Sequence, residues 1–559
     1  MSGFHFSPRP NRAAEIAWRE WSPAAFEAAL EADRPILLGI SAVWCHWCHV
    51  MDETTYSDQG VIDLINRHYV PIRVDNDLRP DVNNRYNMGG WPTTAFLTPQ
   101  GDVMTGATYL PPDQMLGALQ RVQEFYRNRK PEIVSQVLEA RKKASSVVAA
   151  SAGSLDPRLV DAVLSAVENA HDSTYGGFGG SPKFPQTDAI ALLVEQAARR
   201  GEPQLLEMAR FTLRQMAGGG TYDHVEGGFF RYSTTQDWSV PHFEKMLEDH
   251  GGLISGLALA GEGEILDSAT GYLDSVLRDP ATGLYAGSQD ADEQYYALDA
   301  AGRAEHQTPY VDRRVYSNWN SMLAVAYLEA DARLGRPVLR QHAAELLERL
   351  FADNFSATGG MLHAEGAGGQ LGDQVWALLA AVRAFQAGLG EAWLTRGEQV
   401  AAHLEAAYAD AGFGGYFDHA AGETLGRLED RLKPIGENSV AASGLFELGT
   451  LVGGSHLESG RRALESVAQL PPRFGLMAAG WARAYDRYLG EPVKVTTGNR
   501  ELVRAALAIK PYAVIEPSAE QRAIVCLGTL CLAPVADARG LHAALAEQPL
   551  MRTIELPQS

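Results

Sequence analysis

The sequence has few cysteines, few basic residues and no long apolar run, and each shortage excludes a class of protein. Four cysteines in 559 residues are too few for the disulfide framework of a small secreted domain. Lysine and arginine number 48 against 69 acidic residues, so the net charge of −21 argues against nucleic acid or anionic membranes as partners. No stretch approaches the ~20 apolar residues of a membrane span. The N-terminal residues form no apolar secretion signal, so we expect a cytoplasmic protein.

The residues that are abundant indicate a large folded protein. The chain is 46% hydrophobic and holds 10 Trp, 20 Tyr and 18 Phe, enough for a sizeable core. At about 150 residues per domain, the length suggests three or four domains. The four cysteines fall into two close pairs, Cys45/Cys48 and Cys526/Cys531.

The segment CHWCH, residues 45–49, fits three chemistries: a thiol–disulfide pair, a c-type haem attachment site and part of a zinc site. Haem attachment is disfavoured because that chemistry belongs to exported proteins. Zinc is disfavoured because so short a segment cannot direct Cys45, His46, Cys48 and His49 at one ion, and no second ligand cluster follows closely. We therefore expect a redox pair, with no metal and no other cofactor.

The surroundings of the pair favour this interpretation. Residues 34–43 are mostly apolar, as in a buried parallel strand, and residues 44–69 have a helical pattern. Cys45 would begin that helix, where unpaired N–H groups and the helix dipole stabilise a thiolate. His46 would strengthen the effect. Cys48, one turn later, would resolve a mixed disulfide.

The order of elements resembles the thioredoxin fold over about residues 14–130. A second strand follows at 70–77, a third at 93–97, a fourth at 103–109 and a helix at 112–127. The resemblance implies that Pro92, which opens the third strand, forms a cis peptide with Trp91 and faces the cysteine pair. Trp44 would pack beside the same site.

The sequence pattern changes between residues 155 and 489, where long helical patterns alternate with short loops rich in glycine and aromatic residues. The loops recur around Gly177, Gly227, Gly283, Gly360 and Gly415, at spacings that suit a helical hairpin plus a loop. About six such hairpins would close into an (α/α)6 toroid with a cleft at one mouth. An open solenoid is the alternative, and the period alone does not separate the two.

Polar and aromatic residues gather in residues 218–252 and in three later segments. Together they suit sugar chemistry, since a carboxyl pair can hydrolyse a glycoside and a histidine or carboxylate base can abstract a proton beside a carbonyl. We expect them to converge on one pocket, with His242 and Asp290 or Asp292 as acid and base. The substrate-binding candidates are Asp223, His224, Arg231, Tyr232, Asp237, Trp238, Glu244, Trp319 and Asn438.

Several motifs together strongly resemble the spermatogenesis-associated protein 20 family. They are SAVWCHWCHVM, GGWPTTAFLTPQGD, GGFGGSPKFP, YDHVEGGFFRYSTTQDWSVPHFEKML and GENSVAAS. The resemblance implies an N-terminal thioredoxin-like domain and a six-hairpin glycosidase-like toroid similar to that of N-acylglucosamine 2-epimerase. It implies the architecture more clearly than the activity.

The chain departs from the family pattern at the predicted cleft. Gln289 stands where the family tends to have Glu, and residues 318–321 read NWNS instead of SWNG. The family's HFEKMLYDN becomes HFEKMLEDH, and the segment after Asp292 is short. A cleft that has lost an acid and a loop has changed or lost its chemistry.

The last seventy residues resemble a small α/β appendage. In a continuous strand Cys526 and Cys531 would face opposite sides, and they could pair only if Gly528–Thr529 formed a turn. We expect two buried, inert thiols. The predicted domains are therefore 1–130 thioredoxin-like, 131–154 a linker helix, 155–489 the toroid and 490–559 the C-terminal region.

Three functions remain open at this stage. The first is a thiol–disulfide oxidoreductase module fused to a carbohydrate-binding or carbohydrate-active toroid. The second is a sugar hydrolase or epimerase with a structural thioredoxin-like domain, and the third is a non-catalytic scaffold. The expected partners are a sugar-like small molecule or a protein thiol, with neither nucleic acid nor membrane.

Overall fold

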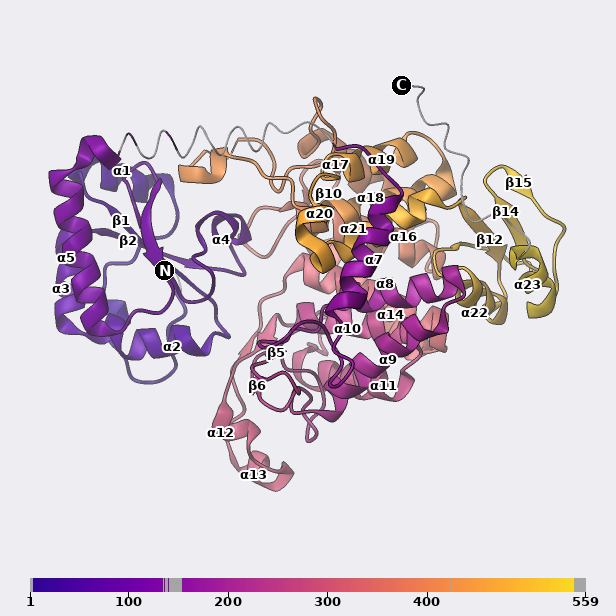
Figure 1. Ribbon diagram of the computed structural model, residues 1–559, viewed down its shortest axis with the longest axis horizontal. Coiled ribbons are helices and arrows are strands. Elements are labelled where there is room, and N and C mark those ends of the chain that lie inside the picture. Colours follow the sequence, from indigo (N-terminus) through magenta and orange to yellow (C-terminus); the bar gives the residue numbers. More distant parts are fainter. Residues whose placement is uncertain (1–3, 134, 136–138, 140–152, 423, 547–559) are drawn as a thin grey trace. The chain divides into compact units, whose positions relative to one another are not determined.

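The computed structural model in Figure 1 describes residues 4–133, 135, 139, 153–422 and 424–546. Most of the predicted linker helix, 131–154, lies outside the described residues. The chain divides into two compact units, Met1–Ala150 with His419–Leu432, and Ser151–Asp418 with Lys433–Ser559. Among the described helices, none combines the length and apolar character needed to cross a membrane.

The first unit is built on a four-stranded sheet in the order β2-β1-β3-β4. Strands β1 (Ile36–Ser41) and β2 (Val70–Asp75) are parallel, whereas β3 (Thr93–Leu97) and β4 (Val103–Ala107) are antiparallel to their neighbours. This mixed sheet, with helices between its strands, confirms the predicted thioredoxin-like fold.

Alternation along β1 directs side chains into two separate cores. Ile36, Leu38 and Ile40 belong to one, and Leu37 belongs to the other. Both faces of the central strand are therefore buried, which explains its unbroken apolar sequence. The helices of the unit are α1 (Pro23–Ala32), α2 (His46–Glu53), α3 (Gln59–His68), α4 (Pro80–Tyr86) and α5 (Pro112–Asn128).

Residues 44–69 are helical over most of their length, as predicted, but they form two helices rather than one. Helix α2 ends at Glu53, a 3-10 turn spans Thr55–Ser57, and α3 starts afresh at Gln59. The physical reason lies in Asp58, whose carboxylate accepts the Val61 N–H at 3.0 Å and caps α3. A strong cap inside a helical pattern begins a new helix.

A segment from the second half of the sequence completes the first unit. Residues His419–Leu432 belong to it, and Leu428 is fully buried in the core that contains Trp21 and Tyr86. The Arg427 N–H donates to the hydroxyl of Tyr86 at 2.8 Å, and the Arg85 guanidinium donates to the carbonyl of Asp430 at 2.6 Å. We call residues 419–432 the inserted segment.

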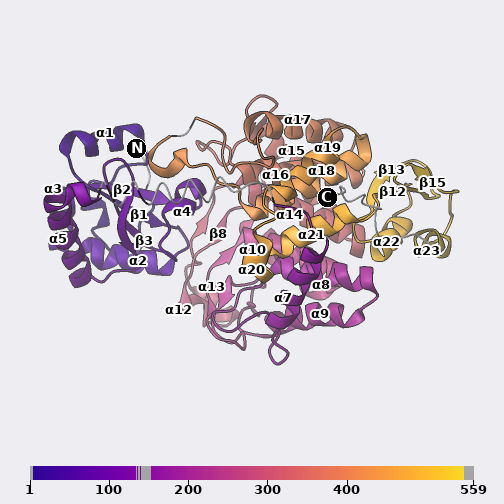
Figure 2. The same cartoon turned by 45° about the horizontal axis from the view of Figure 1, so that its top comes forward.

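Two concentric sets of helices form the body of the second unit (Figures 1 and 2). The inner helices are α8 (Thr187–Arg200), α10 (Leu247–Ala260), α14 (Ser317–Leu334), α16 (Leu371–Gln386), α18 (Ile435–Val452) and α21 (Ala479–Leu489). Each contacts the next in this order, and α21 contacts α8 again, so the ring closes. A closed ring confirms the (α/α)6 toroid and excludes the open solenoid.

The outer helices each pack against an inner one. They are α7 (Arg158–Ala170), α9 (Pro203–Gly218), α11 (Gly263–Tyr272), α15 (Pro337–Asn354), α17 (Ala392–Ala407) and α19 (His456–Glu465). Inner helices such as α16 bury residues on all sides, whereas outer helices such as α9 bury one face. The glycine-rich loops precede the N-termini of inner helices, so these N-termini share one end of the toroid, its mouth.

A repeated hydrogen-bonded clamp ties loops to inner helices. The fourth residue of a helix accepts a loop N–H through its side chain and donates to the carbonyl of the residue four positions earlier. The clamps join His250 to Phe229 (2.9 Å), Asn320 to Tyr285 (2.9 Å), Gln374 to Met361 (2.9 Å) and Asn438 to Tyr416 (2.8 Å). The period seen in the sequence thus corresponds to a repeated structural bond.

The C-terminal residues form a second four-stranded sheet in the order β13-β12-β14-β15. Its elements are β12 (Val493–Thr497), α22 (Arg500–Ile509), β13 (Val514–Pro517), β14 (Ile524–Leu527), β15 (Leu530–Cys531) and α23 (Ala538–Ala546). The N–H of Ile515 donates to the side chain of Gln386 at 2.8 Å, which joins β13 to toroid helix α16. This α/β part therefore packs on the toroid.

Candidate functional site

The two cysteines of the CHWCH segment are joined as a disulfide at the start of α2. Their Cα atoms are 5.2 Å apart, and Cys45 is the N-cap residue of the helix. The Sγ of Cys45 accepts the N–H of Cys48 at 3.2 Å. That N–H is one of the unpaired donors of the helix N-terminus, so it would stabilise a thiolate at Cys45 once the bond is reduced.

Both sulfurs are shielded, because Cys45 is 4% exposed and Cys48 is 2% exposed. Between them, Trp47 is 47% exposed and its ring contacts that of Tyr109 at 5.2 Å. His46, the first residue of α2, is half-buried. An exposed aromatic side chain thus lies next to the two shielded cysteines in the sequence.

His49, which follows Cys48 in α2, is kept neutral. Burial lowers the pKa of His49 to about 4, and the positive charges of His5, His46 and Arg73 act in the same direction. Arg73 is itself buried and pairs with Asp52 at 2.9 Å. The imidazole of His49 thus adds no charge to the redox site at neutral pH.

The residues predicted to support the redox site lie around it. The indole N–H of Trp44 donates to Asp77 at 2.7 Å, and the Trp44 ring contacts Trp91 at 5.7 Å. The Trp91–Pro92 peptide is cis, as predicted. The contact between Trp44 and Trp91 brings the neighbours of Cys45 and Pro92 together.

The second cysteine pair corrects the sequence prediction of two inert thiols. Gly528–Thr529 forms the turn of a hairpin, β14 pairs with β15, and Cys526 stands directly opposite Cys531. The two are joined as a disulfide, with Cα atoms 3.9 Å apart, and Cys531 is exposed. The turn that the sequence required for pairing is present.

A cavity of about 170 Å³ lies inside the toroid and is lined by residues from all six inner helices. Small residues at its wall, among them Gly251, Gly252 and Gly436, keep the interior open. Trp376 supplies an aromatic wall, and Arg383 and Arg483 supply positive charge. Each of these arginines is already paired, with Glu447 at 2.6 Å and with Glu195 at 2.9 Å.

Acidic side chains stand at the mouth of this cavity. Glu248 and Asp249 occupy the first turn of α10, and Glu437 occupies the first turn of α18, beside the glycines that line the cavity. Desolvation raises the pKa of all three carboxyls, that of Asp249 to about 7, although Glu248 is the most exposed of the three; Arg231 opposes the shift at Glu248 and Asp249. Glu248 also raises the pKa of Glu437 by repulsion. We call Glu248, Asp249 and Glu437 the acidic rim.

A histidine–glutamate pair adjoins the acidic rim. The buried carboxylate of Glu244 holds Nδ1 of His242 at 2.6 Å, and the charge of Glu244 contributes to the raised pKa of Asp249. The imidazole stacks on Tyr232 at 4.8 Å, and Tyr232 stacks on Phe184 at 4.6 Å. With Nδ1 held, Nε2 is the ring nitrogen available for proton transfer or for binding.

Four of the predicted cleft residues are therefore neighbours: Arg231, Tyr232, His242 and Glu244.

The acidic rim was missed by sequence reasoning. Its signal was the departure from the family pattern at LEDH, since Glu248 stands where the family tends to have Tyr. His250 in the same departure replaces Asn, which is the clamp residue in α14 and α18.

Other predicted cleft residues brace the fold. Asp223 is buried in ion pairs with Lys245 and Arg303, each at 2.7 Å. Trp238 is fully buried and donates to the carbonyl of Tyr175. Asn438 forms the loop clamp of α18.

The remaining candidates are held by other partners. Asp292 caps the short helix α12 (Glu293–Tyr296), and Asp290 is buried with an oxygen on the N–H of Ala291. Trp319 packs on Tyr316. His224 bonds to the carbonyl of Gly219, and exposed Asp237 accepts from Ser239.

The glutamine that replaces a family glutamate has a structural partner. The side chain of Gln289 accepts the hydroxyl of Tyr272 at 3.1 Å, and Gln289 is 2% exposed. The neutral amide thus replaces a carboxylate inside the fold. Among the described residues, no cluster of three or more His, Cys, Asp or Glu side chains could hold a metal ion.

Comparison with known proteins gives one family-model match in the first unit and several structural neighbours. The family model Thioredox_DsbH, described as "Protein of unknown function, DUF255", matches residues 9–145. Among solved structures, a sugar epimerase from a ruminal bacterium aligns at 13% identity with a TM-score of 0.45, covering 56% of this chain and 85% of that chain. Cellobiose 2-epimerase from Spirochaeta thermophila aligns at 18% identity with a TM-score of 0.46, covering 62% and 95%.

Curated relatives match about half of the sequence. Human spermatogenesis-associated protein 20 is 31% identical over 309 residues, which is 50% of this chain and 39% of the human protein. Uncharacterized protein B0495.5 of Caenorhabditis elegans is 33% identical over 258 residues, or 43% of this chain and 35% of that protein. The matched region thus spans less than two fifths of the length of these relatives. The resemblance to the spermatogenesis-associated protein 20 family is confirmed over this half of the chain.

Proposed function

We propose that the first unit is a thiol–disulfide oxidoreductase that acts on protein thiols. The observation that carries the proposal is the Cys45–Cys48 disulfide at the N-terminus of α2, which follows strand β1 of a thioredoxin-like sheet. A pair in this position can alternate between dithiol and disulfide without a cofactor.

The thiol–disulfide exchange can run in either direction. With the pair reduced, the thiolate of Cys45 attacks one sulfur of a partner disulfide, and the partner's other sulfur leaves as a thiolate. Cys48, deprotonated, then attacks Cys45 and releases the partner's second thiol. Two electrons pass to the partner, and Cys45 and Cys48 end as a disulfide. In reverse, a partner dithiol is oxidised by the same steps.

A redox titration tests the proposal. The protein is equilibrated in buffers of reduced and oxidised glutathione, trapped with an alkylating reagent, and its Cys45–Cys48 peptide is quantified by mass spectrometry. We expect one two-electron transition at the glutathione potentials. The matched control is the Cys526→Ser, Cys531→Ser double variant, which retains the transition. A pair that stays oxidised at all accessible potentials would refute the proposal.

A second function concerns the toroid, and the acidic rim favours it. We infer that the cavity binds a small hydroxyl-rich molecule of the sugar type, as hydroxyl groups can donate to the carboxylates and an apolar ring face can pack on an aromatic wall such as Trp376. With a pKa of about 7, Asp249 can donate a proton near neutral pH, and His242 supplies a base.

A binding screen of monosaccharides and disaccharides tests this second function. His242→Ala and Glu248→Gln should each weaken binding of whatever sugar is found, whereas Asp237→Asn, on an exposed loop, should leave binding unchanged. Asp290→Asn should have little effect if the rim forms the site. Binding that survives the first two variants would place the sugar elsewhere.

A further inference from the structure

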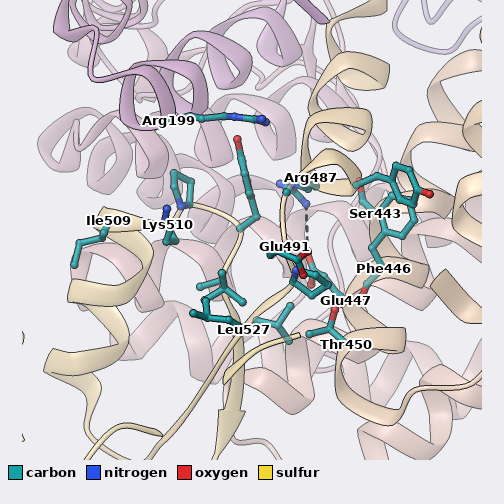
Figure 3. A pocket seen from close by; sticks show the side chains of 18 of the residues that line it. Arg199, Ser443, Phe446, Glu447, Thr450, Arg487, Glu491, Ile509, Lys510 and Leu527 are labelled. Carbon is teal, nitrogen blue, oxygen red and sulfur yellow. Dashed lines mark hydrogen bonds and ion pairs between the residues drawn. The ribbon is translucent and has the colours of Figure 1, made fainter. Parts of the chain in front are cut away.

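A second cavity, of about 140 Å³, lies between the toroid helices and the C-terminal α/β part (Figure 3). Helices α8, α18, α19 and α21 form one side of it, and residues of β12, β13 and β14 with the end of α22 form the other. All of its lining residues belong to the second unit. It shares only Ser443 and Arg487 with the cavity inside the toroid.

The walls of this cavity are mainly apolar. Phe446 and Leu457 line it from the toroid, while Ile509, Val514 and Leu527 line it from the α/β part. These side chains are held in place by their own elements, so the space is preformed. A preformed apolar space with few polar groups is typical of a small-molecule site.

An aromatic surface lies on the toroid side. The ring of Phe446 stacks on that of Tyr488, with centroids 5.5 Å apart and planes at 28°. Both residues line the cavity, and Tyr512 lines it from the opposite part. Flat rings on two sides favour a flat ligand.

The polar groups of the cavity are positive at one end. The side chains of Arg199 and Lys510 lie there (Figure 3), and the charge of Arg199 contributes, after burial, to a lowered pKa of Lys510. Arg199 already pairs with Asp486. Within the described part of the chain, Lys510 has no carboxylate within ion-pair distance.

The acidic residues that line the cavity do not pair with Lys510. Glu447 is already engaged by Arg383 at 2.6 Å and Gln386 at 2.7 Å, and it lies 3.4 Å from Arg487. Glu491 is exposed. Lys510 is thus the lining cation that a ligand anion can neutralise without breaking an existing pair.

We propose that this cavity is a binding site for a small carboxylic acid with a flat apolar body. The carboxylate bonds to the ammonium of Lys510, and the flat body lies against Phe446 and the aliphatic side chains opposite. A space of this size holds roughly ten non-hydrogen atoms, at about 10–15 Å³ of such volume per water-sized group. Aromatic acids of the size of phenylacetate meet both conditions.

Calorimetric titration of the full-length protein with phenylacetate tests the proposal. We expect one saturable site. Lys510→Met, which keeps the length and the apolar stem, should weaken binding at least about tenfold, because a charge-assisted bond is lost. The control is Arg504→Met in α22, the helix that ends just before Lys510, at an exposed position outside the lining; it should leave binding unchanged.

Two further measurements separate the parts of the proposal. Phenylacetamide, which lacks the negative charge, should bind at least about tenfold more weakly than phenylacetate to the unchanged protein. Thr450→Trp, which fills the cavity from α18, should abolish binding while the melting temperature shows that the variant is folded. Absent binding, or binding equal in the Lys510→Met and control variants, would overturn the proposal.

Discussion

Asp223 and Lys245 form an ion pair that is almost entirely removed from water, with Nζ 2.7 Å from Oδ2 and side-chain exposures of 1% and 0%. The ammonium also donates to the carbonyl of Gly227, and Arg303 binds the same carboxylate oxygen. The same bond recurs in two other loops, as Asp172–Lys183 and Asp410–Lys433. The pair is therefore part of the repeated frame of the toroid.

Asp223→Ala should lower the free energy of unfolding by about 3–5 kcal/mol, because the buried ammonium of Lys245 loses its ion-pair partner and Arg303 keeps only Glu226, at 3.1 Å. Asp410→Ala is the matched control, since Lys433 in that pair is 16% exposed and can reach water. We expect less than half the loss there, measured by urea denaturation. Equal losses in the two variants would contradict the role of burial.

The loop clamp predicts a difference between two substitutions at one position. His250→Ala should cost about 1–3 kcal/mol, because the buried N–H of Phe229 loses its acceptor. His250→Asn should cost less, because asparagine forms the same two bonds in α14 and α18. Thermal or urea unfolding of both variants measures the difference. If His250→Asn were less stable than His250→Ala, the packing of the imidazole ring, and not the clamp, would decide stability at this position.

The inserted segment should stabilise the thioredoxin-like unit. Leu428→Ala removes a fully buried side chain beside Trp21 and Tyr86, and we expect a loss of about 2–5 kcal/mol. Hydrogen exchange should then accelerate in β1 and β3, while the inner toroid helices keep their protection. Faster exchange in the toroid alone would contradict the assignment of residues 419–432 to the first unit.

Asp249 gives the stability a defined dependence on pH. In the folded protein its pKa is about 7, against ~3.9 in the unfolded chain. Between these values the folded protein binds more protons than the unfolded chain. The contribution of Asp249 to the free energy of unfolding therefore falls as pH rises from about 4 to 7. Asp249→Asn should remove this part of the slope, and Asp237→Asn should not. An unchanged slope in Asp249→Asn would show that the carboxyl titrates normally.

The thioredoxin-like fold could be predicted because its evidence is local. An apolar strand before CxxC and a proline before the third strand follow directly from the sequence. The inserted segment could not be predicted, since residues 419–432 have the composition of an ordinary loop between α17 and α18. The burial of Leu428 beside Trp21 and the hydrogen bond from Arg427 to Tyr86 show where the segment belongs.

The period of the loops predicted stacked helical hairpins, and the family resemblance, not the period, favoured a closed toroid over an open solenoid. The site of the toroid was predicted only in part. Arg231, Tyr232, His242 and Glu244 were expected and lie together. Asp223 and Asn438 carry the same residue types that sites use, yet their partners are the loops of the fold. The acidic rim was missed because Glu248, Asp249 and Glu437 look like ordinary acids in the first turn of a helix, where the dipole favours them anyway.

The formation of a trapped mixed disulfide tests the central claim most directly. Reduced Cys48→Ser protein, in a Cys526→Ser, Cys531→Ser background, is mixed with oxidised glutathione, and the adduct is measured by mass spectrometry against time and pH. We expect a stable adduct at Cys45 that forms with an apparent pKa well below the ~8.5 of a free thiol, and much slower adduct formation at Cys48 in Cys45→Ser protein. Equal, slow reaction of both single-cysteine proteins, with an apparent pKa at or above that of a free thiol, would contradict it.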